Sequence, residues 1–185
     1  MTLAELLAEI GRRLTQARIP YMVTGSIASS YHGEPRATRD IDIVIDPTPD
    51  SLEQFIGALP PDTFYVDAEG ARTALAERGQ FNVIESASGW KVDLVIRKNR
   101  PFSVTEFERR QAAELLGLRT FVASAEDTII AKLEWAQAGE SDRQLRDAAA
   151  ILAISGEKLD YPYLERWVGA LKLENVWSRI QPSGR

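Results

Sequence analysis

The sequence predicts an α+β fold, in which strands and helices alternate over residues 1–123 and a small helical module follows over residues 124–185. Two observations carry this prediction. Short segments rich in β-branched residues recur between segments with helical spacing of apolar residues, as in a sheet flanked by helices. From Ser124 onwards only helical patterns occur. A chain of 185 residues suits one domain with a helical extension.

An amphipathic helix is predicted to open the fold. Its apolar residues recur at helical spacing with charged residues between them: Leu3, Leu6, Leu7, Ile10 and Leu14. This pattern is not that of a signal peptide, so we expect the segment to belong to the fold. Residues 20–23 then predict a short strand that ends at Thr24-Gly25, and residues 26–31 predict a short helix.

The middle of the chain alternates between strand and helix signals. Residues 41–45 contain three Ile and one Val and predict a strand. Thr48 and Pro49 predict a helix start, because a hydroxyl caps a helix and proline suits its first position. Strands are also predicted at residues 64–66, 81–85, 91–97 and 119–123, and helices at residues 69–78 and from the capping box at 103–106. The Ser-Ala-Ser-Gly sequence at residues 86–89 indicates a hairpin.

The last third of the chain predicts helices alone. The first runs from a capping sequence at Ser124 to about residue 138, and a short link at residues 139–142 leads to a second over about residues 143–154. Further helices are predicted from near residue 160 and over residues 171–180. We therefore place a domain boundary between residues 123 and 124.

Composition limits the classes of function. The net charge of -5 argues against a broad basic surface for nucleic acid. The chain has no cysteine, which excludes disulfides and cysteine-bound zinc. No apolar run approaches the ~18 residues that span a membrane. We expect a cytoplasmic protein with no membrane partner.

Two carboxylates interrupt the strand at residues 41–45. Because residues two apart in a strand point the same way, Asp40 and Asp42 share one face and the isoleucines share the other. Two adjacent carboxylates suit Mg²⁺, which prefers oxygen ligands together with substrate phosphates. Asp93 is a third acid in an apolar strand, and three carboxylates would converge if the two strands were neighbours. Gly25-Ser26, at a strand-to-helix turn, would offer backbone N–H groups to a phosphate.

This pattern of Gly-Ser, a spacer, Asp-x-Asp and a later acid resembles the nucleotidyltransferase superfamily with the polymerase-β-like fold. The resemblance implies a mixed sheet flanked by helices. It further implies that Gly25 and Ser26 bind the nucleotide's phosphates, and that Asp40 and Asp42 bind two Mg²⁺ ions. Asp93 would complete the metal site and help to activate the acceptor.

The helical module is similar to the AbiEii-like toxin branch of this superfamily. The similarity lies in the sequence E-D-T-I-I-A-K-L at residues 126–133 and in R-Q-L-R-D at residues 143–147. It implies that Lys132 and Asp147 belong to the active site, with Lys132 close to the triphosphate. Helical spacing places both on stripes that otherwise face inward, Asp147 together with Ile151 and Ile154.

The function that the resemblance implies is transfer of a nucleoside monophosphate from an NTP to a hydroxyl acceptor. The acceptor would be an RNA end or a protein, and an antitoxin would be a partner. A basic stripe would serve an RNA acceptor, and its candidates are Arg36, Arg39, Arg97, Lys98 and Arg100. Two other hypotheses stay open: a nucleotide-sensing or protein-interaction module without turnover, and a small-molecule nucleotidyltransferase of the antibiotic-modifying type.

Each candidate residue also has a structural interpretation. The two acids of the Asp-x-Asp pair could be solvated on an edge strand. Asp93 could simply pair with Lys91 or Arg97. Lys132 could be a solvated helix residue, and Asp147 could pair with an arginine of its own helix. Arg36 could contact a phosphate or pair with a nearby acid.

Overall fold

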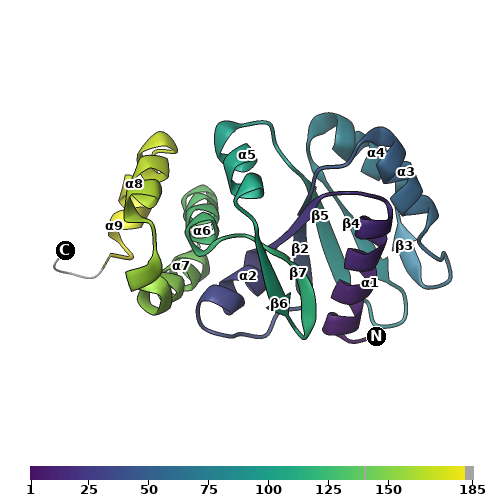
Figure 1. The fold of residues 1–185 in the computed structure, drawn as a ribbon, viewed down its shortest axis with the longest axis horizontal. Helices are drawn as coiled ribbons and strands as arrows, with labels where there is room; N and C mark the ends of the chain where they lie inside the picture. The colour runs from purple at the N-terminus through teal and green to yellow at the C-terminus, as the bar shows by residue number, and fades with distance from the viewer. Residues whose placement is uncertain (140, 182–185) are drawn as a thin grey trace.

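The computed structural model describes residues 1–139 and 141–181. Figure 1 shows a central sheet with helices on both sides, and the C-terminal helices lie farthest from the first helix. Glu140, in the predicted link, and residues 182–185, at the end of the predicted helical module, lie outside the described residues.

The sheet is mixed. Within the described part of the chain it has seven strands in the order β3-β4-β5-β2-β1-β7-β6. Their bounds are β1 Tyr21–Thr24, β2 Asp40–Ile45, β3 Phe64–Val66, β4 Gln80–Glu85, β5 Lys91–Ile96, β6 Gln111–Leu115 and β7 Leu118–Val122. The central strand β2 pairs in parallel with β5 and antiparallel with β1. The predicted mixed sheet flanked by helices is therefore confirmed.

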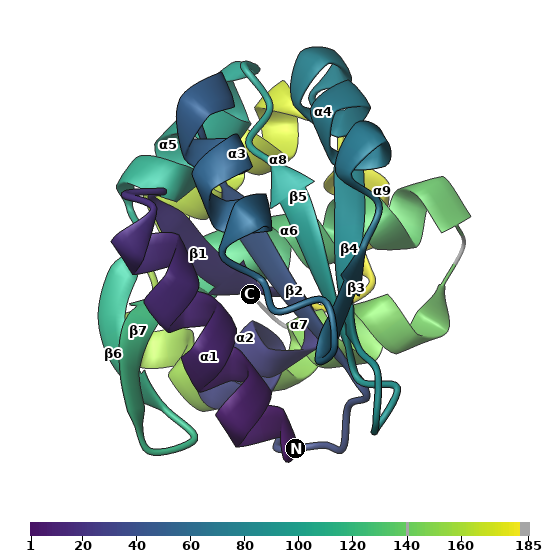
Figure 2. The same cartoon turned by 90° about the vertical axis from the view of Figure 1, so that its right-hand side faces the viewer.

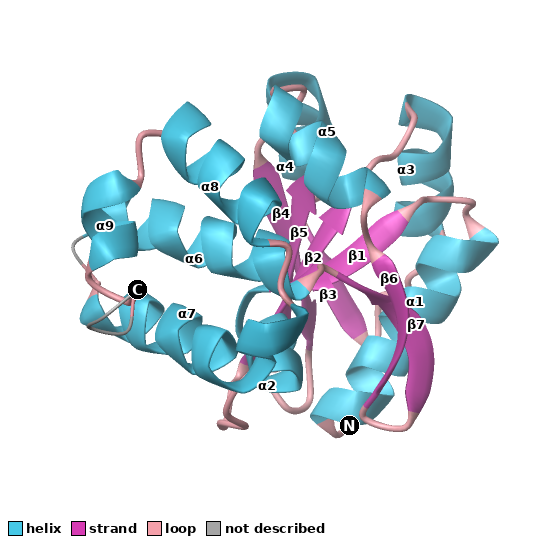
Figure 3. Ribbon diagram, turned by 60° about the vertical axis from the view of Figure 1, so that its left-hand side comes forward, coloured by secondary structure: helices cyan, strands magenta, loops and turns pink. Residues whose placement is uncertain are grey.

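Helices cover both faces of this sheet. One face carries α1 (Leu3–Gln16), α3 (Pro49–Gly57) and α4 (Ala68–Glu77), which stand in front of the strands in Figure 2. On the other side lie α2 (Gly25–His32), α5 (Pro101–Glu108) and α6 (Ala125–Gly139). Three further helices gather around α6 in Figure 3: α7 (Asp142–Ser155), α8 (Tyr161–Ala170) and α9 (Glu174–Ser178). The 3-10 turn η1 (Gly156–Lys158) follows α7.

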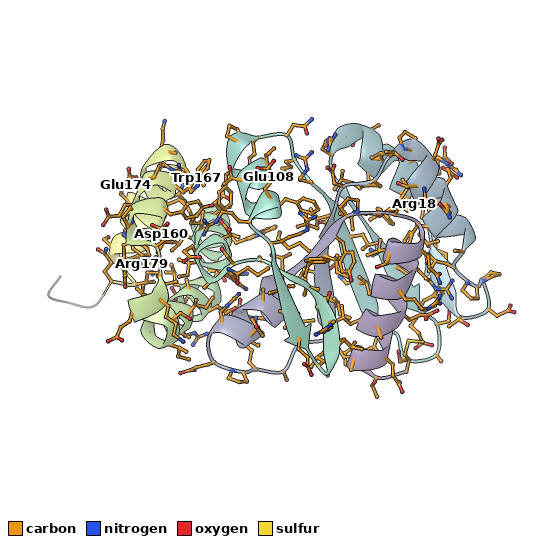
Figure 4. All side chains as sticks on the ribbon, in the orientation of Figure 1. Arg18, Glu108, Asp160, Trp167, Glu174 and Arg179 are labelled. Atoms are coloured by element: carbon orange, nitrogen blue, oxygen red, sulfur yellow. The ribbon has the colours of Figure 1, made fainter. Side chains whose placement is uncertain are left out.

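Two large apolar clusters and a small third one, formed by Met22, Phe107 and Ala123, make up the core of the described residues. The first packs α1, α3 and α4 on the sheet, where Ile41, Ile43 and Ile45 are fully buried. Burial of each such side chain contributes roughly 1.5–3 kcal/mol. The second cluster joins α6 to α9 and includes Phe102 of α5. In Figure 4, Trp167 and Asp160 lie in this C-terminal part, at the opposite end of the molecule from Arg18. The domain boundary after residue 123 stays a prediction.

Three local predictions need correction. Helix α5 begins at Pro101, before the supposed capping box, and the Ser103 hydroxyl accepts a hydrogen bond from Arg100 Nε. Strand β6 was not predicted. It forms a hairpin with β7 through Leu116-Gly117, whose two positive φ angles are typical of a type I′ turn. Ile154 is 60% exposed, so the stripe of Asp147 does not extend inward as far as predicted.

None of the described helices is long and apolar enough to cross a membrane.

A polar cluster joins α5 to the second core. Asp127 is fully buried and accepts hydrogen bonds from the hydroxyl groups of Ser124 and Tyr163. It also forms an ion pair with Arg109. Glu106 is partly buried, and its side chain is close enough to Asp127 for the two carboxyl groups to interact electrostatically. Burial and then the charge of Asp127 raise the pKa of Glu106 to about 8. The native state thus keeps a proton on Glu106 that the unfolded chain releases near its ordinary pKa.

Glu106 is expected to make stability fall as the pH rises. Between the ordinary pKa of 4.5 and about 8 the native state binds more protons than the unfolded state, so its free energy of unfolding decreases. Glu106→Gln should raise the melting temperature at about pH 9 by at least about 3 °C and change it little at about pH 4.5. Thermal unfolding at both pH values tests this. Exposed Glu108, labelled in Figure 4, is the matched control. An equal pH dependence in both variants would contradict the prediction.

Candidate functional site

The three predicted acids lie on the same face of neighbouring strands. Asp42 in β2 stands directly beside Asp93 in β5, and Asp40 stands beside Lys91. This face is opposite to the buried isoleucines, as strand alternation requires. Strand β2 lies between β5 and β1, so the interpretation of its acids as residues of an edge strand is wrong. The Asp93 side chain is 17% exposed, whereas that of Asp40 is 55% exposed.

The carboxyl group of Asp42 has a raised pKa. Burial raises its pKa, and the neighbouring charge of Asp93 raises it further. A hydrogen bond from the Ser26 backbone and the charge of Lys132 act in the opposite direction without cancelling the rise. The fold therefore holds two carboxylates side by side at a cost that a bound cation would relieve.

The turn at Gly25-Ser26 packs directly against Asp42. Strand β1 ends at Thr24, whose register partner is Asp42, and helix α2 begins at Gly25. Gly25 has a φ of +63°, and a Cβ placed there would lie 2.0 Å from Asp42 Oδ2. Only glycine fits this approach without strain. The turn thus brings the first turn of α2 onto the acid face, where its N–H groups can meet an anion.

Lys132 and Asp147 come together from α6 and α7. Lys132 Nζ donates to Asp147 Oδ2 at 2.9 Å, and Lys132 is only 5% exposed, so it is not a solvated helix residue. Burial lowers the pKa of Lys132, and the hydrogen bond to Asp147 acts against this. Burial would raise the pKa of Asp147, but the hydrogen bonds from Lys132 and Arg36 lower it overall. Because Lys132 also influences Asp42, the pair borders the acid face.

Arg36 connects this pair to the Gly-Ser turn. Its Nη2 donates to Ser26 Oγ at 2.7 Å and to Asp147 Oδ2 at 3.0 Å, while Nε donates to Asp147 Oδ1 at 3.2 Å. Asp147 is therefore paired with Lys132 and Arg36 and not with an arginine of its own helix. Sequence spacing could not find this contact, since Arg36 and Asp147 are 111 residues apart.

Two residues of the predicted basic stripe form ion pairs. Arg97 pairs with Asp46, and Arg100 pairs with Glu134, so neither is free for a ligand. A cavity of about 340 Å³ lies beside Asp147 and has Arg36, Arg143 and Arg146 in its lining. A larger cavity of about 450 Å³ lies on another side of α2 and is mainly apolar.

The predicted alternative of an ion pair between Asp93 and Lys91 is confirmed. In the structure its ammonium lies 2.9 Å from Asp93 Oδ2 and 4.0 Å from Asp40 Oδ1. The hydrogen bond to Asp93 raises the pKa of Lys91. This contact could be predicted from sequence, because residues two apart in a strand, such as 91 and 93, point to the same face.

The donor chemistry of this face fits Mg²⁺. Asp42 and Asp93 are carboxylates in direct register, and the missing side chain of Gly25 makes room for the carboxylate of Asp42. Within the described ranges no group of three or more His, Cys, Asp or Glu residues is gathered as a ready-made metal site. Asp40 and Asp93 are oriented toward Lys91 instead.

Comparisons with known proteins agree on the fold. No protein-family model matches the chain, and no curated protein sequence matches it. Among solved structures, an antigenic nucleotidyltransferase-like protein from Paracoccidioides brasiliensis aligns with a TM-score of 0.59 and 17% identity, over 96% of this chain and 91% of that one. The chain has the nucleotidyltransferase fold.

Two antibiotic-modifying proteins share this nucleotidyltransferase fold. ANT(2″)-Ia in complex with adenylyl-2″-tobramycin aligns with a TM-score of 0.58 and 12% identity, over 98% of this chain and 100% of that one. The lincosamide antibiotic adenylyltransferase LnuA, bound to lincomycin, gives a TM-score of 0.54 and 12% identity, over 83% of this chain and 98% of that one. At these identities the likeness concerns the fold alone.

Proposed function

We propose that the protein is a Mg²⁺-dependent nucleotidyltransferase that moves a nucleoside monophosphate from an NTP to a hydroxyl acceptor and releases pyrophosphate. The observation that carries this proposal is the register of Asp42 beside Asp93 on a face against which the Gly25-Ser26 turn packs. An N-terminal helix turn, paired carboxylates and a buried lysine are the groups that an NTP and its cation need.

Each residue has a defined task in this proposal. Asp40, Asp42 and Asp93 hold the cations, which would stabilise both the attacking and the leaving oxygen when bound. The N–H groups at Gly25-Ser26 bind phosphate oxygens. Lys132 faces the negative charge that develops on the departing pyrophosphate, and Asp147 holds Lys132 in place. Asp93 is also the base that takes the proton of the acceptor hydroxyl.

The division of the chain follows from these tasks. Residues 1–123 would be the nucleotidyltransferase core that holds cations and phosphates. Residues 124–185 would be the helical module that supplies Lys132 and Asp147. Both residues lie within the described part of the module.

Two acceptor classes have support from different observations. The similarity of the helical module to the AbiEii-like branch favours an RNA end or a protein as acceptor, with an antitoxin as partner. The fold shared with ANT(2″)-Ia and LnuA favours a small-molecule hydroxyl. A nucleotide-sensing module without turnover is the contrasting hypothesis, and it requires binding without pyrophosphate release.

Calorimetric titration with each NTP, with and without Mg²⁺, tests the proposal. The native chain is expected to bind at least one NTP only when Mg²⁺ is present. Lys132→Met should weaken that binding at least about tenfold, because it removes a charge-assisted contact to phosphate and keeps most of the side-chain volume. Pyrophosphate release with candidate acceptors then separates an enzyme from a sensor.

Lys98→Met is the matched control, because the Lys98 side chain is exposed and forms no ion pair with the acids of this face within the described residues. It should bind NTP as the native chain does. Binding that is indifferent to Mg²⁺ and to Lys132, or no binding of any NTP, would refute the proposed function.

A further inference from the structure

Lys91 lies among the carboxylates of the candidate site. It is the first residue of β5, beside Asp40 in the register and two residues before Asp93 on the same face. Its ammonium is 2.9 Å from Asp93 Oδ2 and 4.0 Å from Asp40 Oδ1. One cation thus stands between two acids from neighbouring strands.

No other basic side chain within the described ranges forms an ion pair with these two acids. Lys132, the nearest buried cation, pairs with Asp147. The acid face therefore depends on Lys91 for local compensation of Asp40 and Asp93, while Asp42 forms no ion pair among the described residues and interacts with the charges of Lys132 and Lys91. Carboxylates of like charge on paired strands repel each other, so this compensation has a direct effect on how they are held.

The Lys91 side chain is also free to leave. It is 36% exposed, and its four-carbon stem ends in a flexible ammonium. Asp40 is more exposed still, at 55%. A partly exposed ion pair of this kind is weak, so a divalent cation with twice the charge can replace the ammonium on the same carboxylates.

We propose that Lys91 is a positioning residue that sets the affinity of this site for divalent cations by competing with them for Asp40 and Asp93. The inference rests on the proposed function. The ammonium holds the two carboxylates of β2 and β5 together, and it turns outward to solvent when a divalent cation takes its place. Lys91 thereby stabilises the fold and weakens cation binding.

A purely structural ion pair and a competing ammonium predict different results for a variant that lacks the Lys91 charge. A purely structural ion pair would lose stability on substitution and would leave cation affinity unchanged or lower. A competing ammonium would lose stability and gain cation affinity. Lys91→Met removes the charge and keeps the apolar stem, and Lys91→Arg keeps the charge.

Titration of the purified full chain with Mn²⁺, in the absence of nucleotide and followed by the free-ion paramagnetic resonance signal, measures this affinity. Lys91→Met is expected to bind Mn²⁺ more tightly than the native chain, by up to about fivefold, which is the upper range for a partly exposed ion pair. Lys91→Arg and the control Lys98→Met should bind as the native chain does. In a chelator the Lys91→Met chain should melt below the native chain, and saturating Mn²⁺ should abolish or reverse that difference.

Equal or weaker Mn²⁺ binding by Lys91→Met, with normal binding by the native chain, would overturn the inference and leave the proposed function standing. Absence of Mn²⁺ binding and of Mg²⁺-dependent NTP binding in the native chain would overturn both. If Lys91→Met does not fold, Lys91→Gln serves as the second uncharged variant and carries the same expectations.

Discussion

Asp42→Asn is expected to abolish turnover and to raise the melting temperature. Asp42 is the acid closest to both the Gly-Ser turn and Asp93, so its loss removes a cation ligand from the centre of the proposed site. A fall in kcat/KM of about 10³-fold corresponds to about 4 kcal/mol of lost charge stabilisation. Once an acceptor is found, steady-state pyrophosphate release measures the fall in kcat/KM. Before then, calorimetry measures the loss of Mg²⁺-dependent NTP binding.

The expected gain in stability of Asp42→Asn comes from the removal of a buried negative charge. Burial and Asp93 raise the pKa of Asp42, so the native state loses stability as the pH rises through that pKa, and a neutral amide escapes the loss. Thermal unfolding at neutral pH without divalent cations should show a higher melting temperature for Asp42→Asn. Asp50→Asn, an exposed acid at the start of α3, is the control and should change neither quantity. Unchanged NTP binding by Asp42→Asn would place the site elsewhere.

Gly25→Ala is expected to damage both the fold and the site. The new Cβ would meet Asp42 at Oδ2, Cγ and Cβ, the last at 2.8 Å, so rotation of the carboxylate alone cannot relieve the contact. The left-handed φ of +63° adds a cost of about 1–2 kcal/mol for a residue with a side chain. We expect a melting temperature lower by at least about 3 °C and a kcat/KM about 10²-fold lower, because a misplacement of about 1 Å has that effect.

Gly57→Ala is the matched control for this substitution. Gly57 closes α3, its φ is not positive, and a Cβ there would have open space. The same change of residue should therefore be neutral or slightly stabilising at position 57. NTP calorimetry and thermal unfolding compare the binding affinity and the melting temperature of the two variants. Equal behaviour of the two variants would show that the close approach at Gly25 has no consequence.

Much of the fold could be predicted because local patterns and packing agree. The alternation Ile41, Ile43, Ile45 requires one buried face, and the observed sheet buries all three. Strand β6 escaped prediction because Gln111 to Leu115 carries little β-propensity, and its pairing comes from the turn at Leu116-Gly117. Helix α5 began earlier than predicted because Pro101 at its first position outweighed the capping sequence at Ser103.

The candidate site was also predictable only in part. The period of two in β2 and β5 determined from sequence alone that Asp40 and Asp42 share a face and that Lys91 and Asp93 share a face. The type of chemistry also followed from residue identity, since carboxylates and a glycine turn suit a cation and a phosphate. The roles of these residues in catalysis stay predictions that the substitutions above test.

Only the tertiary structure decided which of these groups meet. The parallel register that sets Asp42 beside Asp93, the salt bridge of Arg36 to Asp147 and the position of Lys91 between two acids all join residues far apart in the chain or on different strands. Strand order and helix docking depend on the summed burial of both cores, and no local pattern encodes that sum. The sequence by itself determined which residues share a strand face, and long-range packing decided which groups they meet.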